Sequence, residues 1–249
     1  MTAQLFSYRR TPMNNIVKAL INNIDDSEEL DELFNKYITL PRQIISSTEN
    51  VICIQKGTDF YRAVSNPTFI TKPPACKTSI GRLNFKNESV LYLAFSPQTA
   101  YLETKNNYIL HFIAKKSFYA MLSYTPVLDK GFTNPLEHEL DAYKNELCNR
   151  IFSLTPSKTS NVLSNEQIYV LTNKLKSLIY DPLIPALLYP STKIKNNTTL
   201  SKNNNSSELL DCVIFENDED IVTCIEEDTY KYKETYTWKT YLPSVKTAL

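Results

Sequence analysis

Three glycines in 249 residues, Gly57, Gly81 and Gly131, constrain this chain more than any other feature of its sequence. Folds that cradle phosphates with glycine-rich loops, such as the P-loop and dinucleotide-binding βαβ folds, need several glycines close together. No such loop can be built here, and the GxSxG and HExxH motifs are also absent. Any nucleotide that this chain binds must therefore be held by side chains.

Composition and charge exclude further classes of protein. Hydrophobic residues make up 42% of the sequence, which is enough for a buried core in a chain of this length. The 27 Lys and Arg residues balance 27 Asp and Glu residues, so the basic excess typical of proteins that bind nucleic acid is missing. No run of about 18 apolar residues and no signal-peptide core occurs, so we expect no membrane contact. Five scattered cysteines without a CxxC pair predict reduced thiols and no metal site.

The N-terminal part of the chain shows helical periodicity. Asp26 and Glu29 have the spacing of a capping box, and the segment before them is compatible with another helix. We expect residues 1–54 to form a helical extension whose apolar stripe packs against the rest of the chain. The stripe consists of Leu30, Leu33, Phe34, Tyr37 and Ile38.

The remaining sequence predicts an α+β fold. Short β-branched and aromatic runs alternate with turns, and one long helix with Ser164 as its N-cap lies among them. We expect one core domain over residues 55–216 and a β-rich tail over 217–249 that packs on the core. These runs begin at VICIQKGTDFYRAV, and the expected strands are VLYLAF, YILHFIAK, PALLYP, CVIFE and the alternating segment TYKYKETYTWKTYLP.

The stretch GRLNFKNESVLYLAFSPQTAYLE carries the most chemistry. Ser96 and Pro97 are typical of an N-cap and first helical residue, so a helix begins directly after the strand VLYLAF. On that helix Glu103 shares a face with the small residues Thr99 and Ala100, which leaves its carboxylate accessible. The two histidines, in contrast, have ordinary strand and helix contexts and indicate no histidine chemistry.

Four sequence blocks taken together resemble the RES domain, a family named for its Arg, Glu and Ser residues. The blocks FYRAV, GRLN, VLYLAFSPQTAYLE and LLYPS occur in the family's order between about residues 55 and 216. The resemblance implies a split β-sheet core with flanking helices, similar to ADP-ribosyltransferase toxins, whose cleft grips NAD without a glycine loop. The chain departs from the family in lacking a glycine before LLYPS and in the long Asn-rich loop that follows it.

Family members degrade NAD at the bond between nicotinamide and ribose, so the resemblance implies an NAD+ glycohydrolase or NAD+ phosphorylase. It assigns catalysis to Arg62, Glu103 and Ser191, and NAD binding to Arg62, Arg82, Tyr92 and Ser191. In this scheme Glu103 stabilises the oxocarbenium-like ribose, the arginines bind the pyrophosphate and Tyr92 stacks on a ring. Neutral nicotinamide needs no general acid, which agrees with the lack of a catalytic histidine.

The resemblance also implies how the protein operates in a cell. NAD is its substrate, and no other cofactor and no metal is expected. Many family members are toxins of bacterial toxin–antitoxin pairs, which implies an antitoxin or immunity protein that blocks the cleft, a homodimer, and action on cytoplasmic NAD. Two alternatives stay open: an ADP-ribosyltransferase that modifies a macromolecule, and a non-catalytic interaction protein on the same scaffold. The sequence leaves the acceptor open among water, phosphate and a side chain.

Overall fold

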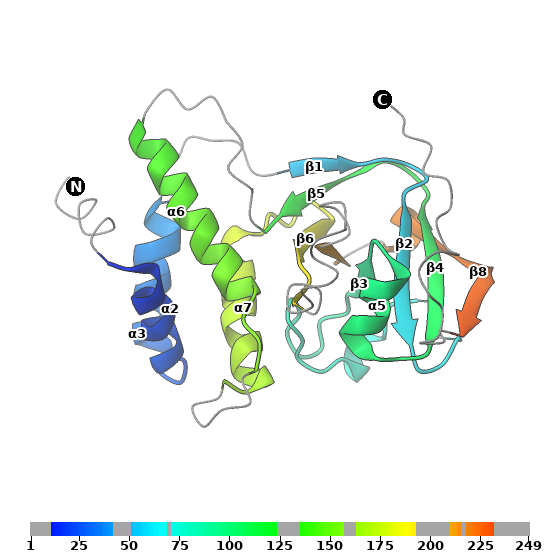
Figure 1. The fold of residues 1–249 in the computed structure, drawn as a ribbon, viewed down its shortest axis with the longest axis horizontal. Helices are drawn as coiled ribbons and strands as arrows, with labels where there is room; N and C mark the ends of the chain where they lie inside the picture. Colours follow the sequence, from blue (N-terminus) through cyan, green and yellow to red (C-terminus); the bar gives the residue numbers. More distant parts are fainter. Residues whose placement is uncertain are drawn as a thin grey trace.

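The structure, a computed structural model, describes residues 11–41, 51–68, 71–123, 135–156, 163–192, 210–215 and 218–231. The Asn-rich loop and most of the aromatic tail lie outside these ranges. The fold is α+β, as the sequence predicted. Figure 1 shows two N-terminal helices at one end, two longer helices next to them, and a β-sheet beyond.

A mixed sheet forms the largest part of the described chain. Its eight strands run in the order β1-β5-β6-β7-β3-β2-β4-β8, and β5 and β6 form its parallel pair. The sequence does not indicate β5, because its continuous apolar run FYAML has no strand periodicity. The strands are β1 (Val51–Ile54), β2 (Asp59–Val64), β3 (Leu91–Ala94), β4 (Tyr108–Ala114), β5 (Phe118–Leu122), β6 (Ala186–Pro190), β7 (Leu210–Ile214) and β8 (Val222–Lys231).

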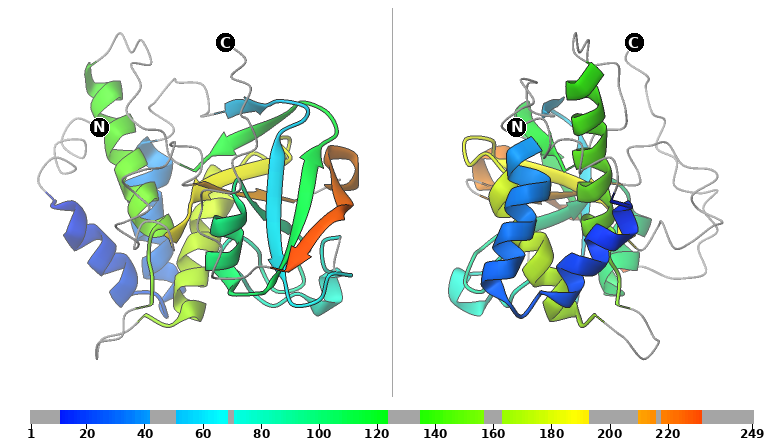
Figure 2. Two further views of the ribbon diagram at one scale, coloured as in Figure 1. Left: turned by 45° about the vertical axis from the view of Figure 1, so that its right-hand side comes forward. Right: turned by 90° about the vertical axis from the view of Figure 1, so that its left-hand side faces the viewer.

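The sheet is strongly curled at the junction of β2 and β3. These two strands share only the register pair Tyr61↔Ala94, whereas β2 and β4 share six pairs. Phe60 on β2 lies 6.4 Å from Phe118 on β5, measured between ring centroids, although three strands separate them in the sheet order. In the left view of Figure 2, the cyan strand β2 passes in front of the yellow strand β6. The concave face therefore encloses its own apolar core, and the convex face is left for the helices.

Helices cover the convex face in two separate places. The short helix α5 packs on β2 and β3, while α6 and α7 lie on the other side of the same face (Figure 1). This arrangement leaves the convex face open between α5 and α7. The described helices are α2 (Met13–Asn22), α3 (Ser27–Phe34) with a π-helical turn (Asn35–Thr39), α5 (Pro97–Thr104), α6 (Pro135–Phe152), α7 (Asn165–Ile179) and α9 (Asp218–Ile221), with a 3-10 turn at Ala75–Lys77.

The N-terminal helices pack against the protein's own core. Asp26 caps α3 by accepting hydrogen bonds from the backbone N–H groups of Glu28 and Glu29. The apolar stripe, on α3 and the π-helical turn after it, packs in one cluster with residues of α2, α6, α7 and the sheet. An ion pair between Asp31 on α3 and Lys174 on α7 joins the same layers. The stripe predicted from the sequence is thus covered by the same chain.

Candidate functional site

Helix α5 carries Glu103 close to the sheet. The Ser96 hydroxyl accepts the N–H of Thr99 at 3.1 Å, and Pro97 occupies the first helical position, so the helix begins where the sequence predicted. Small side chains form the contact with the sheet, namely Ala63, Ala94 and Ala100. Because these alanines let the helix approach closely, Glu103 in the last turn reaches the ends of β6 and β7.

Ser191 meets Glu103 at this point. It follows Pro190, the last residue of β6, and is 2% exposed. Its hydroxyl donates a hydrogen bond to Glu103 Oε1 at 2.5 Å, although 88 residues separate the two in the sequence. A short O–H···O contact of this kind is typical of a charged acceptor. The Glu and Ser of the family resemblance are therefore in direct contact.

The GRLN segment forms a tight turn beside this pair. Gly81 and Asn84 are joined by an isolated β-bridge, with the Gly81 N–H donating to the Asn84 carbonyl at 3.0 Å. The Tyr92 hydroxyl accepts the Leu83 N–H at 2.8 Å and donates to Asn84 Oδ1 at 2.9 Å. Burial raises the pKa of Tyr92 above its ordinary value, so this hydroxyl keeps the proton it donates.

We expect Gly81→Ala to lower the free energy of unfolding by about 1 to 3 kcal/mol. A Cβ at this position would lie 2.3 Å from Asn84 Oδ1 and 3.1 Å from the Tyr92 hydroxyl, which hold each other in place. Chemical denaturation measures the change. Adding Asn84→Ala removes the obstructing atom, so Gly81→Ala should cost less in that background. An equal cost in both backgrounds would contradict the steric explanation.

Helix α7 holds the same turn from the other side. Three of its side chains donate to three consecutive carbonyl groups of the turn. Asn173 Nδ2 donates to Gly81 at 2.7 Å, Thr172 Oγ1 to Arg82 at 2.5 Å, and Lys176 Nζ to Leu83 at 3.1 Å. These bonds fix the backbone of the turn and therefore the position from which the Arg82 side chain projects.

Lys176 is also a buried charge with a defined partner. Its Nζ lies 2.7 Å from Glu88 Oε1, and the other Glu88 oxygen accepts the Phe85 N–H. Burial lowers the pKa of Lys176, and the Glu88 carboxylate opposes that shift. The sequence pattern marks the polar positions of α7 only as a solvent face, so it gave no signal for this role.

The two arginines come from different segments and have different hydrogen-bond partners. Arg82 donates from Nη1 to the Phe152 carbonyl at 2.7 Å and from Nη2 to the Leu154 carbonyl at 3.2 Å, which ties the turn to the end of α6. Arg62 on β2 donates from Nη1 to the Thr71 carbonyl at 2.8 Å. Arg82 thus has a structural function that the sequence did not predict.

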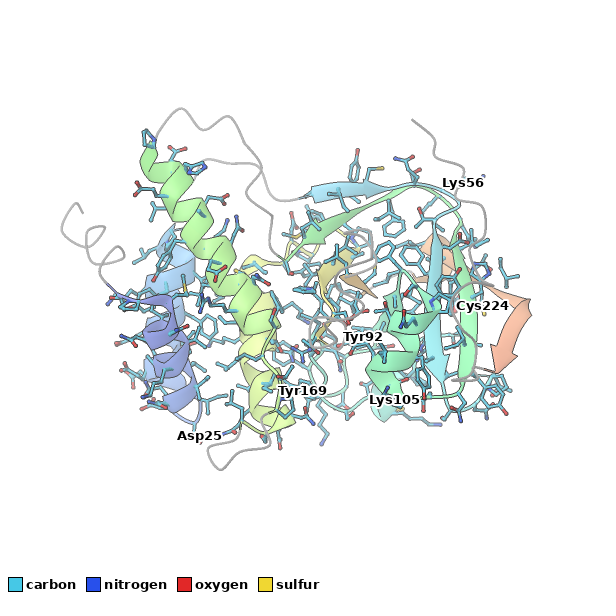
Figure 3. The ribbon with its side chains drawn as sticks, in the orientation of Figure 1. Asp25, Lys56, Tyr92, Lys105, Tyr169 and Cys224 are labelled. Atoms are coloured by element: carbon cyan, nitrogen blue, oxygen red, sulfur yellow. The ribbon has the colours of Figure 1, made fainter. Side chains whose placement is uncertain are left out.

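These pieces enclose a cavity of about 570 Å³ on the convex face, between α5 and α7. Figure 3 shows Tyr92 in this region, between α5 and the helix α7 that carries Tyr169. The volume is within the range of small-molecule and cofactor pockets. Lining residues include Arg62, Arg82, Tyr92, Glu103, Tyr169 and Asp211.

The floor of the cavity is rich in buried titratable groups. Asp211 on β7 is 2% exposed, and burial first, then the neighbouring Glu103, raises its pKa well above the ordinary value. Burial and the proximity of Asp211 likewise raise the pKa of Tyr189 on β6. Sequence reasoning missed Asp211, since LLDCVIF reads as an ordinary strand.

The structure thus brings together most of the residues predicted from the sequence. Glu103 and Ser191 touch, while Arg62, Arg82 and Tyr92 line the same cavity. The predicted stacking role of Tyr92 stays a prediction, and its hydroxyl has the additional function of holding the GRLN turn.

Beyond the cavity, the described ranges contain histidines, cysteines and many acidic side chains. No group of three or more His, Cys, Asp or Glu side chains there is arranged to hold a metal ion. All five cysteines are free thiols. None of the helices in these ranges has the length and apolar character that a membrane crossing requires.

Comparison with known families agrees with this geometry. The RES domain family matches residues 59–238, which is more than half of the chain, and the protein belongs to this family. Membership is consistent with an NAD-related function. No curated protein and no solved structure matches the chain.

Proposed function

We propose that the protein consumes NAD by cleaving the bond between nicotinamide and ribose. The observation that carries the proposal is the Ser191–Glu103 contact of 2.5 Å in a cavity lined by two arginines. A carboxylate, a hydroxyl and guanidinium groups are the groups expected around a sugar whose glycosidic bond is breaking and whose diphosphate needs a cation.

Glu103 has the central role in the proposed reaction. As the bond to nicotinamide lengthens, positive charge develops on the ribose, and a fixed carboxylate close to the ring stabilises that charge. The Ser191 hydroxyl keeps the carboxylate oriented through its hydrogen bond to Oε1. Nicotinamide departs as a neutral molecule, so the site needs no proton donor for the leaving group.

The cavity walls support binding of a dinucleotide. Arg62, which donates from Nη1 to the Thr71 carbonyl, is the arginine that we assign to the pyrophosphate, because both Nη atoms of Arg82 tie the GRLN turn to the carbonyls of Phe152 and Leu154. Tyr92 and Tyr169 line the same cavity and offer flat surfaces for an aromatic base.

The proposal is tested by incubating the purified protein with NAD and measuring free nicotinamide, with and without phosphate. Release without phosphate indicates hydrolysis, and release that requires phosphate indicates phosphorolysis. Transfer of label from NAD to a protein or nucleic acid would instead indicate an ADP-ribosyltransferase. No release under any condition would contradict the proposal and favour a non-catalytic interaction protein.

Arg62→Ala should lower kcat/KM for NAD at least about tenfold, because a charge-assisted hydrogen bond contributes about 1.5 to 3 kcal/mol. In bacteria, we expect the wild-type protein to arrest growth by depleting NAD and Arg62→Ala to relieve the arrest. Arg150→Ala on α6 is a matched control, since Arg150 bonds to Glu146 and Asn14 rather than lining the cavity. Growth arrest at normal NAD levels would contradict the expected mode of toxicity.

Neutralisation of such activity would require a partner that occludes the cavity. We propose an antitoxin or immunity protein for this role. Co-expression with a neighbouring gene product that restores both growth and the cellular NAD level would identify it, and restored growth with NAD still depleted would exclude it.

A further inference from the structure

Asp211 lies close to Ser191 and Glu103, whose hydrogen-bonding groups influence its pKa, but neither side chain makes a well-formed hydrogen bond with it. Neither of its carboxyl oxygens has a partner among the described residues, and both oxygens are buried. In the sheet register Asp211 stands opposite Tyr189 on β6 and opposite Ala94 on β3, so strands cover it on both sides. Buried carboxyl groups are seldom left unsatisfied, because an unpaired polar group in the interior is costly.

The surroundings of Asp211 determine its charge. Glu103 faces it from α5, Tyr189 from β6 and Ser191 from the segment after β6. The nearby cation, Arg82, donates through both Nη atoms to carbonyls at the end of α6. Two adjacent ionised carboxylates would repel each other strongly with so little compensation.

The two carboxyl groups differ in how well they tolerate a negative charge. Glu103 lines the open cavity and accepts a hydrogen bond from Ser191. Asp211 is deeper, and the nearby Ser191 hydroxyl, the donor that would favour an ionised Asp211, donates to Glu103 Oε1 instead. Burial, followed by the proximity of Glu103, raises the pKa of Asp211. A single proton on this pair therefore belongs on Asp211.

We propose that Asp211 is a positioning residue that keeps the proton of a Glu103–Asp211 carboxyl pair, so that Glu103 is the single anion of the cavity. The protonation state is a property of the free protein. Its catalytic consequence rests on the proposed function: a neutral Asp211 leaves the negative charge on the group that touches the ribose. Ionisation of Asp211 at alkaline pH places a second anion behind Glu103, and the two carboxylates then repel each other.

Infrared spectroscopy tests the protonation directly, without NAD. The wild-type protein at neutral pH should show the C=O band of a buried carboxylic acid, and the near-isosteric variant Asp211→Asn should lack it. In Glu103→Gln the repelling charge is gone, so the band of Asp211 should disappear at a lower pH than in the wild type. Absence of the band from the wild-type protein, or an unchanged midpoint in Glu103→Gln, would overturn the proposal.

The pH dependence of stability gives a second test. Because its pKa is raised in the folded protein, the contribution of Asp211 to stability is fully present in acid and is lost as pH rises through that raised pKa. Asp211→Asn cannot ionise, so its stability relative to the wild type should increase with rising pH. Parallel stability curves for the two proteins would contradict the inference.

Turnover measurements separate this inference from the proposed function. The alkaline fall of the wild-type pH–rate profile should be missing in Asp211→Asn. A loss as large as that of Glu103→Gln would show that an ionised Asp211 is needed, which overturns the proposal. If the infrared band is present but neither the wild type nor the variants cleave NAD, the inference about the carboxyl pair is supported and the proposed reaction is contradicted.

Discussion

Glu103→Gln should lower the rate of NAD cleavage by about a hundredfold or more, the size of effect seen when one electrostatic contact to a transition state is removed. The substitution keeps the side-chain shape and an oxygen that can accept the Ser191 hydroxyl, but it removes the negative charge facing the ribose. Nicotinamide release at saturating NAD measures the change in kcat.

Two controls make the result specific to the cavity. Glu32→Gln removes an exposed carboxylate from α3 and should leave turnover unchanged. The melting temperature of Glu103→Gln should lie close to that of the wild type, which shows that the loss is not caused by unfolding. Turnover above one tenth of the wild-type value in a folded Glu103→Gln protein would remove Glu103 from its proposed role.

Phe34→Ala should destabilise the protein by about 3 to 5 kcal/mol, as expected for emptying a filled aromatic site in a core. Phe34 ends α3, is 1% exposed, and belongs to the cluster that joins the N-terminal helices to α6 and α7. For a chain of this size the loss corresponds to a fall in melting temperature of roughly 10 °C, measurable by calorimetry.

Leu183→Ala is the matched control for this prediction. Leu183 is 89% exposed, so its truncation should change the melting temperature by less than about 2 °C. If Phe34→Ala has the same melting temperature as the wild type, the N-terminal helices are not docked on the core in solution. The apolar stripe would then be available to a partner instead.

Local signals made much of the fold predictable. The caps at Asp26, Ser96 and Ser164 depend on residues within one helical turn, and all three helices begin where these residues indicate. The strands with β-branched or aromatic alternation were likewise visible. Strand β5 was not, because a run of five apolar residues fits a strand and a buried helix segment equally well.

The site residues were predictable only where they lie in the sequence blocks that resemble the RES domain. Glu103 and Ser191 stood out in this way, but their contact depends on packing between α5 and the end of β6. Asp211 and Lys176 gave no signal in the sequence. The role of Asp211 arises from the strand register, and that of Lys176 from the face of α7 that contacts the GRLN turn. Such long-range pairings leave no periodicity in a single sequence.

The two faces of α7 have a practical consequence for anyone who shortens this protein. One side of the helix holds three carbonyls of the GRLN turn, and the other contacts the N-terminal helices, as the Lys174–Asp31 ion pair shows. A fragment trimmed to the family match at 59–238 would lack α2 and α3 and leave part of the large apolar cluster uncovered. Loss of activity in such a fragment would therefore reflect weaker packing of α7 under the GRLN turn. The chemistry should be tested on protein that keeps the N-terminal helices.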